Sequence, residues 1–268
     1  MAENKSILFI GDVIAEPGLK AVEEYLPGLI QKYEPHLVII NGENAAEGKG
    51  ITETEANRLF MLGVDVVTSG NHVWDNWKSR PLLANNPKVL RPANYPPGNA
   101  GRGYLFHQLE DGSEIAVINL QGRTYMQTID CPFRSADSIL KNIGVQTKLI
   151  IVDFHADATA EKVAMGWHLD GLVSAVIGTH IHIPTADARI LPQGTGYITD
   201  VGMTGPFDSV VGMKKEIALK RLLLQTPFKY EVASGDVRIC GVQLLINTET
   251  GKTVKIESFM HPKPMQSL

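Results

Sequence analysis

The chain has 268 residues, of which 44% are hydrophobic and 20% charged, a composition typical of a globular protein with a sizeable core. Its 25 basic and 29 acidic residues give a net charge of −4, and without a basic tail or cluster we expect no duplex nucleic acid as partner. The chain lacks a secretory signal, an apolar run near the ~20 residues that cross a bilayer, and a CxxC pair, so we expect a cytoplasmic protein with reduced Cys131 and Cys240 and no membrane contact.

The first half of the chain alternates short apolar runs with helix-like stretches. Strands are predicted at 7–10, 37–40 and 64–68, and a helix at 17–33 that Pro27 should break or kink. A second helix is predicted from the capping box Thr52 to Glu55 as far as about Leu62, before Gly63. This order of strands and helices predicts a parallel sheet with right-handed crossovers.

The pattern of predicted elements changes in the second half of the chain. A loop rich in Asn, Pro and Gly at 85–103 precedes strands at 103–109 and 114–120, which flank the tight-turn signal Asp111-Gly112. Residues 121–147 read as irregular and partly helical, and 261–268 as a loose tail. The remaining predictions are strands at 149–154, 174–177, 188–191 and 196–199, helices at 159–168 and 213–225, and a hairpin of 237–247 with 253–259. We therefore expect a second, more antiparallel region of sheet within one domain, residues 1–268.

Five of the apolar runs end in residues that can bind a metal. Because the carboxyl ends of parallel strands share one edge of a sheet, such residues can meet in one pocket. Their mixture of nitrogen and oxygen donors suits Mn, Fe, Zn or Co. Seven ligands are too many for one tetrahedral site and suit two metals that share a bridging carboxylate. The candidates are Asp12, Glu43, Asn44, Asn71, His155, His180 and His182.

The order of these blocks resembles a known family. Gly-Asp, Gly-Glu-Asn, Gly-Asn-His, a lone His and Gly-Thr-His-Ile-His follow one another between Gly11 and His182. This order resembles the calcineurin-like metallophosphoesterases, and more narrowly their YmdB-like phosphodiesterase branch. The broad superfamily has Asp-x-His in its first block, where this chain has Ile14, and an Asp bridge where it has Glu43. Asn44 offers an oxygen in place of the missing His, and both changes resemble the YmdB-like branch.

The resemblance implies a fold and a ligand set. The expected fold is α/β, a four-layer α/β/β/α sandwich of two mixed sheets. It also implies two metal ions, most often iron or manganese, that share the bridging carboxylate of Glu43. One ion would be held by Asp12, Glu43, Asn44 and His182, and the other by Glu43, Asn71, His155 and His180.

The residues after Asn71 include a candidate acid. Adjacent residues do not easily face the same ion, so we predict that His72 is the acid that protonates the leaving oxygen. We expect Asp75 to cap a short helix, with the orientation of His72 as the alternative. Trp74 and Trp77 are expected in the core, the alternative being a wall of a base-binding pocket.

The leading hypothesis is a dinuclear metallophosphodiesterase in which a hydroxide bridging the metals attacks phosphorus in line. The resemblance implies 2′,3′-cyclic nucleotides as substrates. The alternatives are a phosphomonoesterase and a metal-binding regulatory protein that acts through partners. Amidohydrolases place His-x-His at the first strand and an Asp late, the reverse of the order found here. Whether the chain forms a homo-oligomer stays open.

Overall fold

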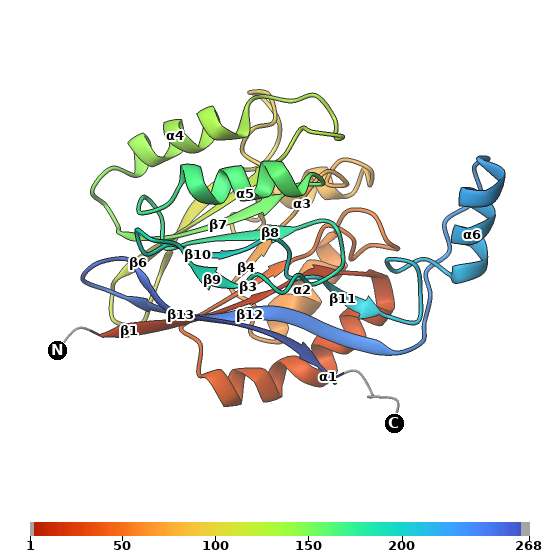
Figure 1. The fold of residues 1–268 in the computed structure, drawn as a ribbon, viewed down its shortest axis with the longest axis horizontal. Helices are drawn as coiled ribbons and strands as arrows, with labels where there is room; N and C mark the ends of the chain where they lie inside the picture. The colour runs from red at the N-terminus through yellow and green to blue at the C-terminus, as the bar shows by residue number, and fades with distance from the viewer. Residues whose placement is uncertain (1–2, 264–268) are drawn as a thin grey trace.

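In the computed structural model, which describes residues 3–263, two mixed sheets pack face to face and helices cover their outer faces, whereas the helix Lys215–Leu224 projects from one end (Figure 1). The first sheet has the order β2-β11-β12-β1-β3-β4, with β13 also paired to β12. Its strands are β1 (Asn4–Ile10), β2 (Asp12–Val13), β3 (Leu37–Asn41), β4 (Val66–Thr68), β11 (Met203–Pro206), β12 (Val237–Asn247) and β13 (Thr253–His261). The expected four-layer sandwich is confirmed.

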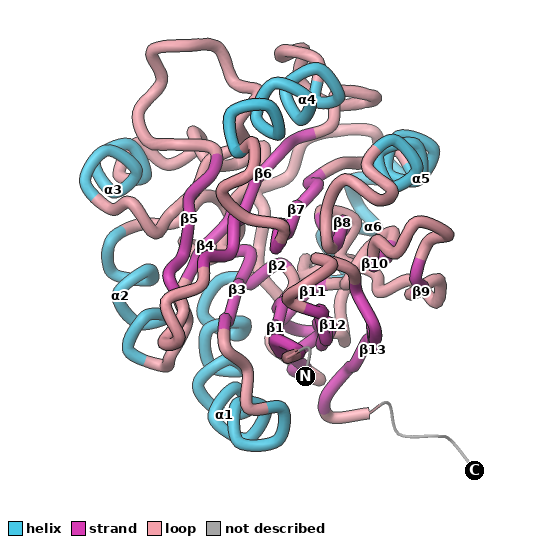
Figure 2. Tube along the Cα trace, turned by 90° about the vertical axis from the view of Figure 1, so that its left-hand side faces the viewer, coloured by secondary structure: helices cyan, strands magenta, loops and turns pink. Residues whose placement is uncertain are grey.

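The second sheet has the order β5-β6-β7-β8-β10-β9. Its strands are β5 (Tyr104–Gln108), β6 (Glu114–Gln121), β7 (Leu149–His155), β8 (Ala175–Thr179), β9 (Arg189–Ile190) and β10 (Gly196–Ile198). The helices are α1 (Ala15–Tyr33), α2 (Glu53–Met61), α3 (Ser79–Asn85), α4 (Pro132–Ile143), α5 (Thr159–His168) and α6 (Lys215–Leu224). In Figure 2, α1 and α2 lie on one side of the sheets and α4 and α5 on the other.

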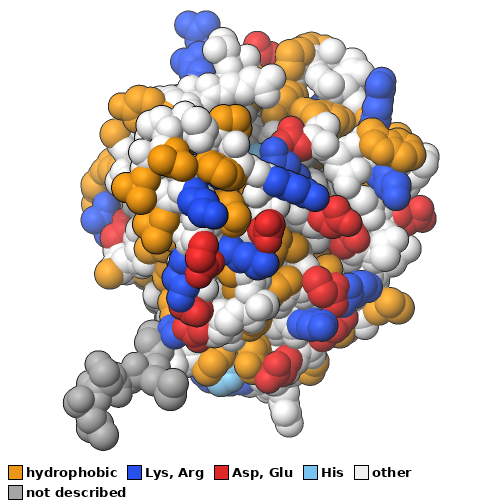
Figure 3. Space-filling model, turned by 90° about the vertical axis from the view of Figure 1, so that its right-hand side faces the viewer, with side chains coloured by type: hydrophobic (Ala, Val, Ile, Leu, Met, Phe, Trp, Pro, Cys, Tyr) orange, Lys and Arg blue, Asp and Glu red, His pale blue; other side chains and the backbone are white. Residues whose placement is uncertain are grey.

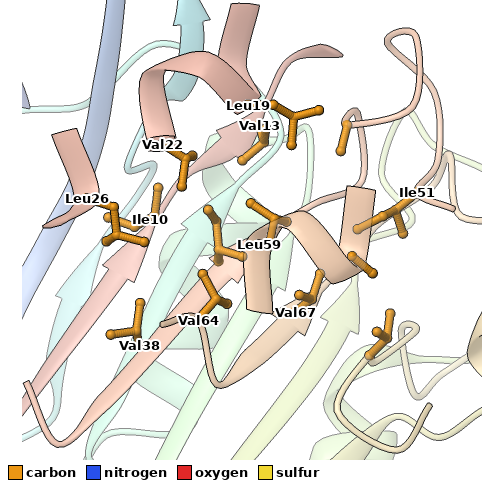
Figure 4. Close-up of a cluster of buried hydrophobic side chains, with 14 of the residues drawn as sticks. Ile10, Val13, Leu19, Val22, Leu26, Val38, Ile51, Leu59, Val64 and Val67 are labelled. Carbon is orange, nitrogen blue, oxygen red and sulfur yellow. The ribbon is translucent and has the colours of Figure 1, made fainter. Parts of the chain in front are cut away.

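The layers follow from the two-residue period of a strand, which sends successive side chains to opposite faces. On β1, Ile7 and Phe9 pack between the sheets with residues of β6 and β7, such as Val117 and Ile151. Leu8 and Ile10 turn to the other face and join the cluster that α1 and α2 cover (Figure 4). A third cluster lies between the second sheet and helices α4 and α5. Both faces of both sheets are therefore buried, as runs of continuous apolar residues require.

The parallel strands predicted in the first half are confirmed, since β1 pairs with β3 and β3 with β4 in parallel. The expectation of a more antiparallel second region is wrong in part. The centre of the second sheet is parallel, because β6, β7, β8 and β10 pair in that sense. The C-terminal hairpin of β12 and β13 joins the first sheet instead, where β12 pairs antiparallel with β1. Pairing between strands that lie far apart in the chain leaves no local pattern in the sequence.

Some predicted boundaries differ from the structure. Helix α1 runs unbroken through Pro27. Proline has no N–H to donate to the carbonyl of Glu23, but both residues lie on the exposed face of the helix, where water can take the place of that donor. The stretch 121–147 contains the whole of α4, and the structure adds the short elements β2, β11 and α3. Of the predicted tail, His261 ends β13, whereas residues 264–268 lie outside the described residues.

Cys131 and Cys240 are both free thiols. Within residues 3–263, no helix has both the length and the apolar character that crossing a membrane requires.

Candidate metal centre

The candidate ligands lie where strands of both sheets end. β1 runs from left to right in Figure 1, so its carboxyl end and those of the parallel β3 and β4 lie on the right. The second sheet contributes His155, the last residue of β7, which lies in register with Thr179 at the end of β8. The five blocks thus come from two sheets rather than from one edge, and the sandwich brings them together.

His155 is the centre of the best-defined group. Its Nε2 lies 3.0 Å from Glu43 Oε1, 3.0 Å from Asn71 Oδ1 and 3.0 Å from His180 Nδ1. Ligand atoms of Glu43, His155 and His180 all lie within 4.8 Å of one another. These four residues are the set expected around one of the two metals.

The other expected set is linked to the first through Glu43 and His180. Asn44 Nδ2 lies 3.2 Å from Glu43 Oε1 and 3.3 Å from His182 Nε2. Rotation of the side-chain amide by 180° would present its oxygen, the atom that binds metals, at the same place. Asp12 accepts a hydrogen bond from the backbone N–H of His180 at 3.2 Å and lies 3.7 Å from His155 Nδ1. All seven predicted ligands therefore meet in one region.

A buried chain of hydrogen bonds orients His155. Its Nδ1 lies 2.9 Å from Thr179 Oγ1, and Thr179 donates to Asp153 Oδ1 at 2.8 Å. Because the single Thr179 proton goes to Asp153, its oxygen accepts from His155 Nδ1–H. Asn41 holds the second oxygen of Asp153 at 2.9 Å. This tautomer leaves Nε2 with a free lone pair that points at the other candidate ligand atoms, the arrangement that metal-binding histidines show.

The donors fit a metal ion. Glu43 Oε1, Asn71 Oδ1 and His180 Nδ1 all lie 3.0 Å from His155 Nε2, and a single proton on that nitrogen cannot satisfy all three, so a cation satisfies them better than one hydrogen bond does. Among the residues that the structure describes, Asp12 Oδ1 is fully buried without a hydrogen-bond partner, a costly state for a carboxylate. A Cβ at Gly70 would lie 2.3 Å from Glu43 Oε2, so glycine keeps this space open.

The charges of the group are strongly coupled. Burial disfavours a charged His155, but the carboxylates of Glu43 and Asp12 outweigh it and raise the pKa of His155 to about 9. Burial likewise opposes ionisation of Glu43, but His155 holds the pKa of that carboxyl well below its usual range. Burial and the charge of His155 lower the pKa of His180 to about 3, and burial raises that of Asp12 to about 6. Without metal, one proton on His155 thus stands in for a cation.

The His-x-His segment has an unusual backbone. His180 and His182 have φ values of 106° and 65°, in a region where residues with side chains are strained. Asp200 holds the segment, since its carboxylate accepts the backbone N–H of Ile181 at 3.0 Å and that of Gly202 at 2.8 Å. Lys162 of α5 balances the charge of Asp200 at 2.6 Å, and both side chains are buried. A buried ion pair therefore anchors the loop that carries two candidate ligands.

His72 lies beside the ligand group and contacts Glu43 through its backbone rather than through its ring. Its backbone N–H donates to Glu43 Oε2 at 3.2 Å, whereas its Nδ1 lies 2.9 Å from Asp75 Oδ2. The prediction that Asp75 caps a helix is wrong, since α3 begins only at Ser79; the alternative, that it orients His72, agrees with the contact. Burial opposes the charge of Asp75, but hydrogen bonds from His72 and Lys49 hold its pKa below the usual value.

The two tryptophans have different surroundings. Trp74 packs against the core, with its ring 5.8 Å from that of Tyr95, as expected. The same expectation for Trp77 is wrong, because its side chain is 78% exposed. Trp77 lines a cavity with Thr52 and Pro81, away from the candidate ligands.

Sequence reasoning missed several residues of the site. Asp153 carried a signal, because it lies two residues before His155 on the same strand and therefore on the same face. Asp200 carried none, since only the fold brings it to the ligands.

Figure 3 faces the side where the carboxyl ends lie, and there Lys and Arg are interspersed with Asp and Glu. No surface of a single charge sign dominates this view.

Known proteins resemble the chain along nearly its whole length. A family model described as YmdB-like protein matches residues 8–259. A 2′,3′-cyclic-nucleotide 2′-phosphodiesterase of Bacillus subtilis (strain 168) is 49% identical over 254 residues, 95% of this chain and 96% of that protein. A putative phosphatase/phosphodiesterase of Mycoplasma genitalium is 38% identical over 266 residues, 95% and 92% of the two chains. The crystal structure of a novel phosphatase of Mycoplasma pneumoniae has a TM-score of 0.91 at 33% identity and covers 97% of this chain and 94% of that one.

Proposed function

Since the chain belongs to the YmdB-like protein family and is a phosphodiesterase, we propose that it hydrolyses 2′,3′-cyclic nucleotides at a dinuclear metal centre. The substrate class is the one that the Bacillus subtilis relative is named for. The observation that carries the metal centre is the convergence of Glu43, Asn71 and His180 on Nε2 of His155. Since both sheets contribute to this group, we also propose that residues 1–268 form one domain.

We assign the ligands as two sets that share Glu43. Glu43, Asn71, His155 and His180 would hold one ion, and Asp12, Glu43, Asn44 and His182 the other. The mixed nitrogen and oxygen donors suit iron or manganese. When bound, the ions would stabilise charge on the phosphoryl oxygens and lower the pKa of a water nucleophile.

The protein side chains would direct the remaining chemistry. Water adds to phosphorus as the bond from phosphorus to O2′ breaks, so O2′ needs a proton and the product is a 3′-nucleotide. We assign His72 as the source of that proton, an assignment supported by its partly exposed side chain in the cavity that Asn71 and His180 also line. Asp75 would fix the ring through Nδ1, which turns Nε2 toward the substrate.

Metal content and hydrolysis should be measured together on the purified protein. We expect about two metal ions per chain and conversion of 2′,3′-cyclic AMP to 3′-AMP. If the protein with two metals cleaves only phosphomonoesters, the phosphomonoesterase alternative replaces the proposal. If it cleaves neither class of ester, the regulatory alternative replaces it.

Replacing His72 separates its role from metal binding. The His72→Ala variant should retain both metals and lose about 100-fold in kcat, the lower range for general acid catalysis. A substrate whose leaving group needs no proton, such as a 4-nitrophenyl phosphodiester, should lose much less. Loss of metal in this variant would show that His72 is a ligand rather than an acid.

Metal binding should depend on pH through His155. The metal-free protein holds a proton on His155 up to about pH 9, and a bound metal must displace it. The affinity for metal should therefore rise with pH up to about 9. The charged His155 also stabilises the metal-free protein, and this contribution should be lost between the unfolded pKa of His155, about 6.5, and its folded pKa of about 9. Calorimetric titration with Mn²⁺ at pH 7.5 in two buffers of different ionisation enthalpy should show roughly one proton released per chain. A binding enthalpy that does not depend on the buffer would contradict this prediction.

A further inference from the structure

The loop 122–131, between β6 and α4 in Figure 1, forms one wall of a cavity beside the candidate ligands. The cavity has a volume of about 220 Å³. Tyr125, Met126 and Gln127 of the loop line it together with Asn71, His72, Asp75 and His180. A phosphodiester held at Asn71 and His180 would therefore share this cavity with the loop residues.

Tyr125 occupies a backbone position that does not suit tyrosine. It is the third residue of a turn closed by the bond from Met126 N–H to the Arg123 carbonyl, 3.3 Å, and its φ is 62°. Turns that need a positive φ at this place normally have Gly or Asn there, and another residue costs roughly 1–2 kcal/mol. The Tyr125 side chain is 87% exposed, so burial does not offset the cost. Stability of the fold therefore does not explain a tyrosine here, whereas contact with a ligand does.

The turn is held firmly at its base. The backbone N–H groups of Arg123 and Thr124 donate to the buried carboxylate of Glu161 at 3.0–3.2 Å. Gly122 N–H donates to the carbonyl of His155 at 2.9 Å. A Cβ at Gly122 would lie 2.5 Å from the Cβ of Ala156, so a larger residue would not fit there. The loop is thus tied to the strand end that carries His155, so Tyr125 has a set position relative to the candidate ligands.

We propose that Tyr125 is a stacking platform for the base of the nucleotide substrate. This inference rests on the proposed function, and it names the part of the protein that recognises a nucleotide rather than any cyclic phosphodiester. Stacking on an aromatic ring contributes roughly 1–3 kcal/mol and tolerates every base, because each base has a π-face. The enzyme should therefore require a base while discriminating little among the four.

Two cyclic phosphodiesters with the same five-membered ring test the proposal: 2′,3′-cyclic AMP and glycerol 1,2-cyclic phosphate, which has no base. The measured quantity is the ratio of kcat/KM for the first to kcat/KM for the second. Tyr125→Ala should lower this ratio roughly tenfold, mainly through KM, since stacking acts on bound substrate and transition state alike. Tyr125→Phe should keep the ratio. Trp77→Ala, which removes an exposed aromatic side chain from a different cavity, is the matched control and should not change it.

Tyr125→Gly adds a readout that does not depend on activity. Glycine suits the positive φ, so this variant should unfold at the same temperature as the wild type or higher, while its ratio falls as in Tyr125→Ala. An unchanged ratio in Tyr125→Ala, with the wild type active on both compounds, would refute the stacking platform and leave the proposed function intact. A wild type that cleaves neither compound would refute the proposed function, and the platform with it.

Discussion

A Glu43→Gln variant should bind neither metal ion firmly and should lose on the order of 10⁴-fold in kcat/KM, the equivalent of several kcal/mol of transition-state stabilisation. Glu43 Oε1 lies 3.0 Å from His155 Nε2, and Asn44 Nδ2 lies 3.2 Å from the same oxygen. Glu43 therefore contacts residues of both proposed ligand sets. Glutamine keeps the size of the side chain but removes the charge and the second equivalent oxygen that a bridge between two ions requires.

The measurement is metal per chain together with kcat/KM for 2′,3′-cyclic AMP. Glu47→Gln is the matched control, because it makes the same substitution on the exposed side of the same loop and should change neither quantity. Metal-free Glu43→Gln should also lose the partner that keeps His155 protonated. If the variant keeps two metals and wild-type activity, Glu43 is not the bridge and the assignment of both sets is wrong.

Lys162→Met should lower the free energy of unfolding by about 3–5 kcal/mol, the usual cost of leaving one charge of a buried ion pair without its partner. Lys162 Nζ lies 2.6 Å from Asp200 Oδ2, and the two side chains are 2% and 0% exposed. Asp200 also holds the backbone of Ile181 between the two histidines of the His-x-His segment. The variant should therefore bind metal more weakly as well as unfold more easily.

Thermal unfolding without metal should show a fall of roughly 10 °C in Tm for a protein of this size. Lys214→Met is the matched control, since Lys214 pairs with Glu231 at 2.8 Å on the surface, and loss of an exposed pair has little effect on stability. Adding Asp200→Asn to Lys162→Met should recover part of the lost stability, because no unpaired charge then remains buried. Equal Tm values for the Lys162→Met and Lys214→Met variants would show that the buried pair does not anchor the loop.

The sequence was most informative where local order dictates structure. Residues 7–10, 37–40 and 149–152 are continuous apolar runs, and each became a buried parallel strand. The polar residues that follow these runs had to lie at carboxyl ends, so Asp12, Glu43 and His155 could be found by their position. The same logic did not place Asp75, whose contact with His72 depends on a turn without a sequence pattern.

The sequence by itself determined which side chains would be available as ligands, because a ligand needs only the right atoms at the end of a strand. Only the tertiary structure decided how they meet. The sheet pairing placed the second hairpin, β12 and β13, in the first sheet, and the sandwich brought the ends of two sheets together around His155. It also brought Tyr125 and His72 to one cavity and the Asp200 carboxylate to the backbone of the His-x-His segment. These contacts join residues far apart in the chain, and their geometry depends on packing and burial, which no local pattern encodes.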